Sequence, residues 1–184
     1  MNKAIFLDRD GTINVDYGYV HNISDFHFIA GVIESLKSMY DLGYLLIVIS
    51  NQSGIGRKYY TEEDCNRVFD YMVNFLDENG VKISKYYYCP HVDEDCCDCR
   101  KPGLKLFYDA IREFDIDVDK SFAIGDKIRD LAICFETPVK GILLNDTSDN
   151  IDVSDCSNIV KRKSMLEALE YIKEMNGVIN NEKK

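Results

Sequence analysis

Residues 5–12 read Ile-Phe-Leu-Asp-Arg-Asp-Gly-Thr, so an apolar run leads directly into two carboxylates and a Gly-Thr turn. The apolar run over 4–7 predicts a short buried strand that ends at Asp8. Two carboxylates one residue apart suit catalysis, because one can act as a nucleophile while the other donates a proton, and both can help to hold Mg²⁺. A generic Asp-x-Asp is more often an ordinary polar turn, but the complete pattern of strand, paired aspartates and Gly-Thr favours a functional site.

Apolar runs and helical periodicities alternate along the rest of the chain. Short apolar runs predict further strands over 45–49, 85–89, 121–124, 141–144 and 157–160. Helical spacing predicts helices over 31–42, from Thr61 to near Gly80, and over 104–114, 128–136 and 164–175, with a frayed tail at 180–184. Asp64 follows Thr61 by three residues, which is close to a capping box. The alternation predicts an α/β fold, a Rossmann-like three-layer α/β/α arrangement with a mainly parallel sheet.

Polar residues follow several of the predicted strands, where α/β folds bind their ligands. Ser50-Asn51-Gln52-Ser53 follows the second strand, Arg100-Lys101-Pro102 precedes a predicted helix, and Gly125-Asp126-Lys127 follows another strand. A serine hydroxyl can hydrogen-bond a transferring phosphoryl oxygen, and a lysine can neutralise phosphoryl charge. The alternative for each stretch is an ordinary polar loop or a solvated pair of cations.

The four stretches at Asp8, Ser50, Lys101 and Asp126 resemble the four motifs of the haloacid-dehalogenase superfamily of phosphotransferases, in the family order. The resemblance implies that Asp8 attacks phosphorus to give an aspartyl-phosphate, and that Asp10 protonates the leaving group and then activates water. It further implies catalytic roles for Ser50 and Lys101. A catalytic Mg²⁺ would be held by Asp8, the Asp10 backbone carbonyl and Asp126, with support from Asp130.

Four of the seven cysteines lie within eleven residues, in Cys89-Pro90-His91 and Cys96-Cys97-Asp98-Cys99. Thiolates and an imidazole at this spacing suit a tetrahedral Zn²⁺. Adjacent cysteines can hardly both bind one ion, so the spacing favours Cys89, His91, Cys97 and Cys99, and Cys96 remains an alternative to Cys97. Four protein ligands make such a site structural, within a zinc-binding loop over 89–99. A disulfide cluster or free thiols are the competing interpretations, and a reducing compartment disfavours the former.

The chain is too short to carry the cap domain that many superfamily members have, so we expect a capless fold. Residues 8–21, 51–57 and 87–91 resemble the D-glycero-D-manno-heptose 1,7-bisphosphate 7-phosphatases, which remove the C7 phosphate during nucleotide-activated heptose synthesis for surface polysaccharide such as lipopolysaccharide. The resemblance implies that the substrate is bound by Asp16, Tyr17, Gly18, Tyr19, Ser50, Asn51, Gln52, Ser53, Arg57, Arg100, Lys101 and Lys127. The short interval between His91 and Cys97, and the absence of a His-Pro after Pro102, instead resemble the histidinol-phosphate phosphatases of histidine biosynthesis.

Composition limits the remaining classes of function. The chain has 184 residues, with 22 Lys and Arg against 32 Asp and Glu, for a formal net charge of −10. This length predicts one domain over 1–184. An acidic chain without a basic run argues against nucleic acid, and no apolar stretch is long enough for a membrane span. We therefore expect a cytoplasmic monomer that acts on a small phosphorylated sugar. The alternative is a zinc-stabilised binding protein without catalysis, which is disfavoured by the joint presence of Asp8, Asp10, Lys101 and Asp126.

Overall fold

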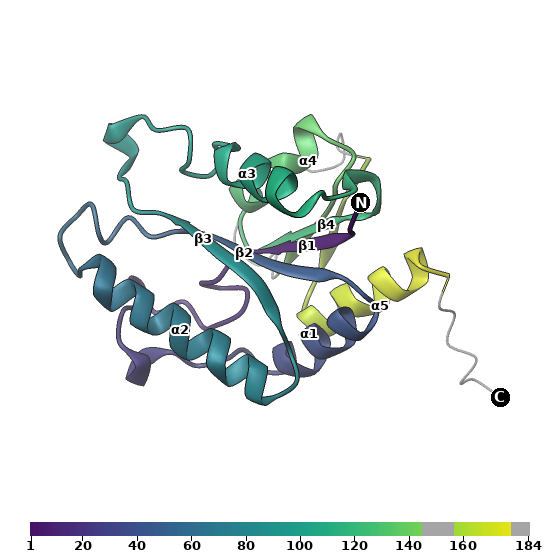
Figure 1. Cartoon of the computed structure of the whole chain (residues 1–184), viewed down its shortest axis with the longest axis horizontal. Coiled ribbons are helices and arrows are strands. Elements are labelled where there is room, and N and C mark those ends of the chain that lie inside the picture. The colour runs from purple at the N-terminus through teal and green to yellow at the C-terminus, as the bar shows by residue number, and fades with distance from the viewer. Residues whose placement is uncertain (145–156, 178–184) are drawn as a thin grey trace.

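The computed structural model describes residues 1–144 and 157–177, which contain a six-stranded parallel sheet in the order β3-β2-β1-β4-β5-β6 (Figure 1). The strands are β1 (Ala4–Leu7), β2 (Leu45–Asn51), β3 (Ile83–Cys89), β4 (Phe122–Gly125), β5 (Lys140–Leu144) and β6 (Ile159–Arg162). The helices are α1 (Val32–Asp41), α2 (Glu62–Glu78), α3 (Lys105–Phe114), α4 (Ile133–Glu136) and α5 (Met165–Met175). The predicted α/β fold with a parallel sheet is confirmed.

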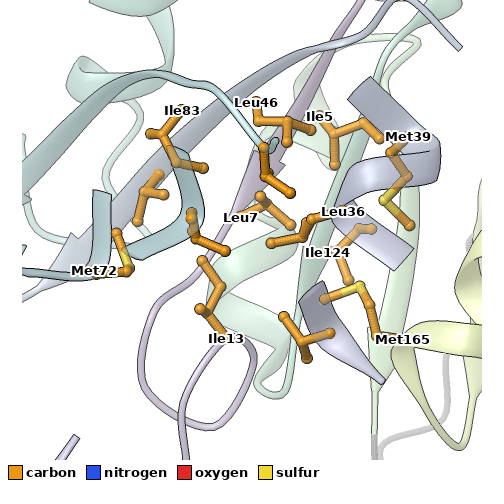
Figure 2. Close-up of a cluster of buried hydrophobic side chains, with 14 of the residues drawn as sticks. Ile5, Leu7, Ile13, Leu36, Met39, Leu46, Met72, Ile83, Ile124 and Met165 are labelled. Atoms are coloured by element: carbon orange, nitrogen blue, oxygen red, sulfur yellow. The ribbon is translucent and has the colours of Figure 1, made fainter. Parts of the chain in front are cut away.

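Helices cover both faces of the sheet. On one face, side chains of α1, α2 and α5 pack against alternate residues of the strands, and Figure 2 shows Ile5 and Leu7 of β1 next to Leu36 of α1. On the opposite face, Phe6 of β1 packs against α3 through an edge-to-face contact with Phe107, with ring centroids 5.4 Å apart. Strands buried on both faces read as continuous apolar runs, which is why β1 and β2 could be recognised in the sequence.

The start of α2 follows the predicted capping pattern. The Thr61 hydroxyl accepts a hydrogen bond from the backbone N–H of Asp64 at 3.1 Å, and the Asp64 carboxylate accepts one from the backbone N–H of Thr61 at 2.8 Å. Both bonds satisfy N–H groups that a helix start otherwise leaves unpaired. The predicted capping box is therefore confirmed.

The predicted helix over 128–136 is wrong in form. A 3₁₀ turn over Ile128–Leu131 precedes the short α4, because the Asp130 carboxylate folds back to accept the backbone N–H of Lys127 at 3.0 Å. Pro138 then prevents the helix from continuing. The last strand begins at Ile159 and runs to Arg162, two residues later than predicted at each end. The tail at 180–184 lies outside the described residues.

Within 1–144 and 157–177, every helix is too short or too polar to cross a lipid bilayer.

Candidate active site

The carboxyl ends of β1, β2 and β4 converge on one cavity of about 340 Å³. Strand β1 lies between β2 and β4, at the point where the strand order reverses, so Asp8, Ser50 and Asp126 meet there. The cavity is lined by acidic, basic and polar residues: Asp8, Asp10, Asp16, Gly18, Tyr19, Ser50, Asn51, Gln52, Ser53, Arg57, Tyr60, Arg100, Lys101, Asp126, Lys127, Arg129 and Asp130.

Lys101 lies at the buried centre of the site, with 2% of its side chain exposed. Its ammonium Nζ is 2.7 Å from Asp8 Oδ1, 2.7 Å from Asp130 Oδ1 and 2.6 Å from the carbonyl oxygen of Ile49. Burial and the charge of Asp130 raise the pKa of Asp8 to about 7, although Lys101 opposes them. Burial alone would lower the pKa of Lys101, but Asp130 and Asp8 outweigh it and raise that pKa. One ammonium is therefore shared by two carboxylates.

Three carboxylates are placed to share a cation. Oxygen atoms of Asp8, Asp126 and Asp130 all lie within 4.8 Å of one another. Burial raises the pKa of Asp126, Asp130 adds to this effect, and Lys127 opposes it. Three carboxylates with one buried ammonium carry a formal charge of −2, and oxygen ligands of this kind suit a hard divalent cation such as Mg²⁺. The donor set therefore fits the predicted metal, and Asp130 belongs to the same cluster of carboxylates as Asp8 and Asp126.

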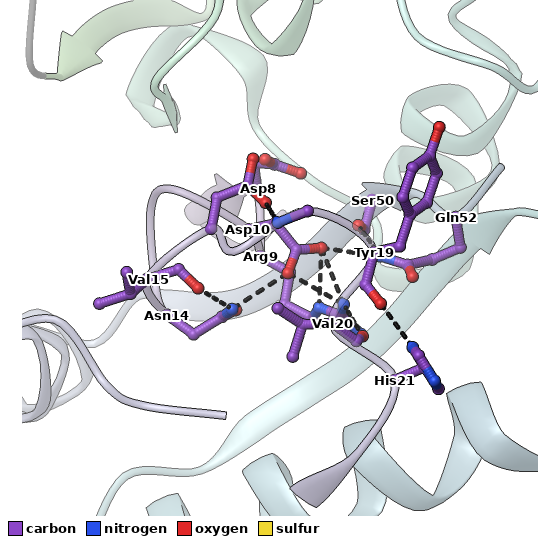
Figure 3. A network of polar contacts seen from close by, with 12 residues as sticks. Asp8, Arg9, Asp10, Asn14, Val15, Tyr19, Val20, His21, Ser50 and Gln52 are labelled. Carbon is purple, nitrogen blue, oxygen red and sulfur yellow. Dashed lines mark hydrogen bonds and ion pairs between the residues drawn. The ribbon is translucent and has the colours of Figure 1, made fainter. Parts of the chain in front are cut away.

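The side chain of Asp10 is fully engaged by neighbouring donors (Figure 3). Its two oxygens accept hydrogen bonds from Arg9 Nε at 3.0 Å, Arg9 Nη2 at 2.9 Å, Asn14 Nδ2 at 3.0 Å and Gln52 Nε2 at 2.9 Å. Arg9 is completely buried, and its guanidinium lies 4.8 Å from the ring centroid of Phe69. These contacts fix the Asp10 carboxylate beside the cavity, and sequence reasoning assigned no role to Arg9.

The loop after β2 makes more contacts with the protein than the sequence implied. Gln52 Nε2 also donates to Ser50 Oγ at 2.9 Å, and Gln52 Oε1 accepts from the Tyr60 hydroxyl at 2.7 Å. The Asn51 side-chain amide accepts a hydrogen bond from the backbone N–H of Lys101 at 2.9 Å and donates one to the backbone carbonyl of Lys101 at 3.0 Å. Asn51 and Gln52 therefore line the cavity while their amides are held by other residues.

The remaining predicted substrate residues occupy the rim of the cavity, with one exception. Tyr17 is not among the lining residues, is 63% exposed, and packs its ring edge-on against His27 with centroids 5.7 Å apart. Arg100 is held by the Asp93 carboxylate, through Nε at 2.5 Å and Nη2 at 3.2 Å. Lys127 lies 3.5 Å from Asp126.

Arg129 lines the same rim and was missed in the sequence. Its side chain is exposed, and it makes no hydrogen bond or ion pair with any residue in the described ranges. The same holds for the side chain of Arg57, as far as the described residues go. The signal was present in the order of residues 125–130, since Arg129 lies between Asp126 and Asp130 and shares the 3₁₀ turn Ile128–Leu131 with Asp130. The rim thus presents two arginines that form no ion pair among the described residues, although both add to the effect of Arg100 in lowering the pKa of Asp93.

The second candidate metal site lies beside this rim. The Sγ atoms of Cys89, Cys97 and Cys99 and Nδ1 of His91 all lie within 4.8 Å of one another. The separations of Cys99 Sγ from the other three atoms are 3.2 to 3.4 Å. Cys96 is exposed and directs its Sγ to the carbonyl oxygen of Asp93, 3.8 Å away. The cluster therefore groups the four residues favoured by spacing, and three sulfurs with one imidazole are the donors that Zn²⁺ prefers.

Comparisons with known proteins show the family of the chain. The model of the family described as polynucleotide kinase 3 phosphatase matches residues 3–158. A D-glycero-beta-D-manno-heptose-1,7-bisphosphate 7-phosphatase of Haemophilus ducreyi is 47% identical over 145 residues, which cover 75% of this chain and 80% of that protein. A D-glycero-alpha-D-manno-heptose-1,7-bisphosphate 7-phosphatase of Campylobacter jejuni is 37% identical over 172 residues, which cover 94% and 96% of the two chains.

A solved structure of similar shape supports the fold. The crystal structure of D,D-heptose 1,7-bisphosphate phosphatase from B. bronchiseptica, complexed with magnesium and phosphate, matches with a TM-score of 0.84. It is 24% identical, and the match covers 94% of this chain and 99% of that one. The resemblance drawn from the four strand-end stretches is thereby confirmed. The chain belongs to the polynucleotide kinase 3 phosphatase family and is a phosphoric monoester hydrolase with the haloacid-dehalogenase fold.

Proposed function

We propose that the protein removes the C7 phosphate of D-glycero-D-manno-heptose 1,7-bisphosphate and leaves heptose 1-phosphate. The observation that carries the proposal is the buried Asp8–Lys101 pair at the floor of a cavity whose rim bears arginines. The buried pair suits a phosphoryl group under attack, and the rim suits the second phosphate of a bisphosphate. The names of relatives at 47% and 37% identity support the same substrate.

The reaction begins with the phosphate over Asp8. An Asp8 oxygen attacks phosphorus in line, the bond between phosphorus and the C7 oxygen breaks, and an aspartyl-phosphate forms. Lys101 offsets the negative charge of the phosphoryl oxygens, and the Ser50 hydroxyl donates a hydrogen bond to one of them. Lys101 reaches Asp8 from 2.7 Å, so it needs no rearrangement to act on the reacting group.

Asp10 handles the protons in both steps. It gives a proton to the departing C7 oxygen, and it then takes one from the water that hydrolyses the aspartyl-phosphate and releases inorganic phosphate. Four hydrogen bonds hold the Asp10 carboxylate, so it must exchange at least one of them to reach the leaving oxygen. The Gln52 amide is the contact on the cavity side and is the one we expect to be exchanged.

Two metals belong to the proposal. Asp8, Asp126 and the Asp10 backbone carbonyl would hold a Mg²⁺, which supplies positive charge to the phosphoryl oxygens when bound, and Asp130 would support this shell. Cys89, His91, Cys97 and Cys99 would hold a structural Zn²⁺ that fixes the loop before Arg100 and Lys101. We also expect the protein to be cytoplasmic and monomeric, and size-exclusion chromatography with light scattering would test the monomeric state.

Histidinol phosphate is the second candidate, favoured by the short interval between His91 and Cys97. Its amine is cationic at neutral pH, whereas the rim of this cavity carries Arg57, Arg100, Lys127 and Arg129. Asp93 pairs with Arg100 and Asp126 lies near Lys127, but Arg57 and Arg129 form no ion pair among the described residues, so the rim favours a substrate whose far end is anionic.

The deciding experiment is phosphate release from a panel of three substrates with Mg²⁺ present. The panel holds the α and β anomers of heptose 1,7-bisphosphate and histidinol phosphate. We expect the highest kcat/KM on one heptose anomer, which also assigns the protein to a biosynthetic route for lipopolysaccharide, capsule or S-layer heptose. A higher kcat/KM on histidinol phosphate than on either anomer would overturn the proposal.

A further inference from the structure

Asn51 is the last residue of β2, and its side-chain amide contacts one residue at two points. Its Oδ1 accepts the backbone N–H of Lys101 at 2.9 Å, and its Nδ2 donates to the backbone carbonyl of Lys101 at 3.0 Å. The two residues are 50 positions apart in the chain. A single amide that brackets one peptide segment in this way fixes both its position and its direction.

The same strand also holds the other end of Lys101. The carbonyl oxygen of Ile49, two residues before Asn51, accepts a hydrogen bond from Lys101 Nζ at 2.6 Å. Strand β2 is paired on both sides, to β1 and to β3, and is a rigid part of the sheet. Lys101 is therefore anchored to β2 at its backbone by Asn51 and at its ammonium by Ile49.

Lys101 needs this anchor because it does not lie on a regular element. It belongs to the connection over 90–104, which contains only one 3₁₀ turn, Asp93–Asp95, between β3 and α3. Its ammonium must nevertheless reach Asp8 and Asp130, each at 2.7 Å. A displacement of about 1 Å at a catalytic group can cost on the order of 10²-fold in rate. The position of the backbone at residue 101 therefore matters to the chemistry.

We infer that Asn51 is a positioning residue that acts through Lys101 and not a residue that binds substrate. The inference departs from the substrate-binding role that the sequence suggested for Asn51. The inference rests on the proposed function in one respect, since it takes Lys101 as the group that offsets the negative charge of the phosphoryl group. The identity of the sugar does not enter.

A double-mutant cycle between Asn51→Ala and Lys101→Met tests the inference. Phosphate release is measured in single-turnover and in steady-state experiments, with p-nitrophenyl phosphate and with heptose 1,7-bisphosphate, at saturating Mg²⁺. Ser53→Ala is the matched control, because Ser53 lines the same cavity from the same loop and has no described hydrogen bond to Lys101. Thermal melting and zinc content show whether each variant is folded.

We expect Asn51→Ala to lower the rate of the chemical step about 10- to 100-fold, with KM changed by less than about threefold. In the Lys101→Met background the same substitution should change the rate by less than about twofold. Ser53→Ala should have the same effect in both backgrounds. Equal losses from Asn51→Ala with and without Lys101 would overturn the inference, because they would show that Asn51 acts independently.

Two further outcomes keep the test decisive. If Lys101→Met does not fold, the division between kcat and KM in Asn51→Ala decides alone, and a loss confined to KM overturns the inference. If wild type hydrolyses p-nitrophenyl phosphate but not heptose 1,7-bisphosphate, the proposed substrate fails while the cycle on p-nitrophenyl phosphate still tests Asn51. The two failures are thus distinguishable.

Discussion

Replacing Asp8 with Asn should remove turnover and, at the same time, make the folded protein more stable above pH 7. The Asp8 side chain is only 11% exposed and shares the Lys101 ammonium with Asp130. Burial and the neighbouring Asp130 raise the pKa of Asp8 from 3.8 to about 7, despite the attraction of Lys101. Holding this carboxylate ionised is therefore unfavourable for the fold. Asn has nearly the same shape and carries no charge.

The raised pKa of Asp8 determines the sign and the size of the change in stability. Because the pKa of Asp8 in the folded state lies above the unfolded value, the contribution of Asp8 to wild-type stability is fully present below about pH 4 and is lost as the pH rises from 3.8 to about 7. The difference between these two values corresponds to a loss of at most about 4 kcal/mol. Asp8→Asn avoids this loss, so we expect its free energy of unfolding to exceed that of wild type by about 1 to 4 kcal/mol at pH 8. For a chain of this size, that is roughly 2–4 °C in Tm for each kcal/mol.

The assay is denaturant unfolding at pH 4, 6 and 8, without added Mg²⁺ and without chelator. The variant is compared with wild type at each pH, so that any loss of metal from the cysteine cluster at low pH affects both proteins alike. Phosphate release measured on the same samples should be absent in the variant. Asp77→Asn is the control, since Asp77 is an exposed carboxylate of α2, and it should show no such pH-dependent gain. If Asp8→Asn is less stable than wild type at pH 8, the attraction to Lys101 outweighs burial and the reasoning is refuted. Normal turnover would refute Asp8 as the nucleophile.

Three further predictions concern the two metal sites and the rim. Gly11→Ala should raise the Mg²⁺ concentration needed for half-maximal activity and lower kcat/KM at least about tenfold. The reason is that Gly11 has φ +84° and an added Cβ would lie 2.5 Å from Asp126 Oδ2. An unchanged Mg²⁺ titration would contradict this prediction. Arg129→Gln should raise KM for the bisphosphate about 5- to 10-fold and leave KM for heptose 7-phosphate unchanged, whereas equal increases would exclude a role at the second phosphate. Cys97→Ser should reduce bound zinc below about half an ion per chain while Cys96→Ser retains it, and the reverse result by metal analysis would exchange the two ligands.

The sequence was sufficient for the strands that carry the site. Buried parallel strands need apolar side chains on both faces, so β1 and β2 appear as uninterrupted apolar runs. Each run stops at the residue where a polar side chain enters the cavity, such as Asp8. The position of the reactive residues relative to the sheet therefore followed from two simple rules, apolar runs form strands and ligands bind at their carboxyl ends.

The contacts between distant loops could not be predicted in this way. Spacing indicates that Asn51 lies at a strand end, but not that its amide turns toward Lys101, 50 residues away. The burial of Arg9 could not be predicted either, because nothing in the sequence indicates that a charged residue between two aspartates is completely buried over the ring of Phe69. The helix predicted over 128–136 failed for a related reason, since the ion pair of Asp130 with Lys101 and its bond to the Lys127 N–H favour a tight turn.

The distribution of charge with depth explains how an acidic chain can take up an anionic substrate. The carboxylates of Asp8, Asp126 and Asp130 lie at the floor, where Lys101 and the proposed Mg²⁺ would together balance their charge. The arginines lie on the rim, where Arg57 and Arg129 have no carboxylate partner among the described residues. A net charge of −10 over the whole chain repels anions at long range, but salt screens that field within about 10 Å. If the proposed bisphosphate is the substrate, the rim cations would hold one phosphate while the other lies at the floor beside Asp8 and Lys101.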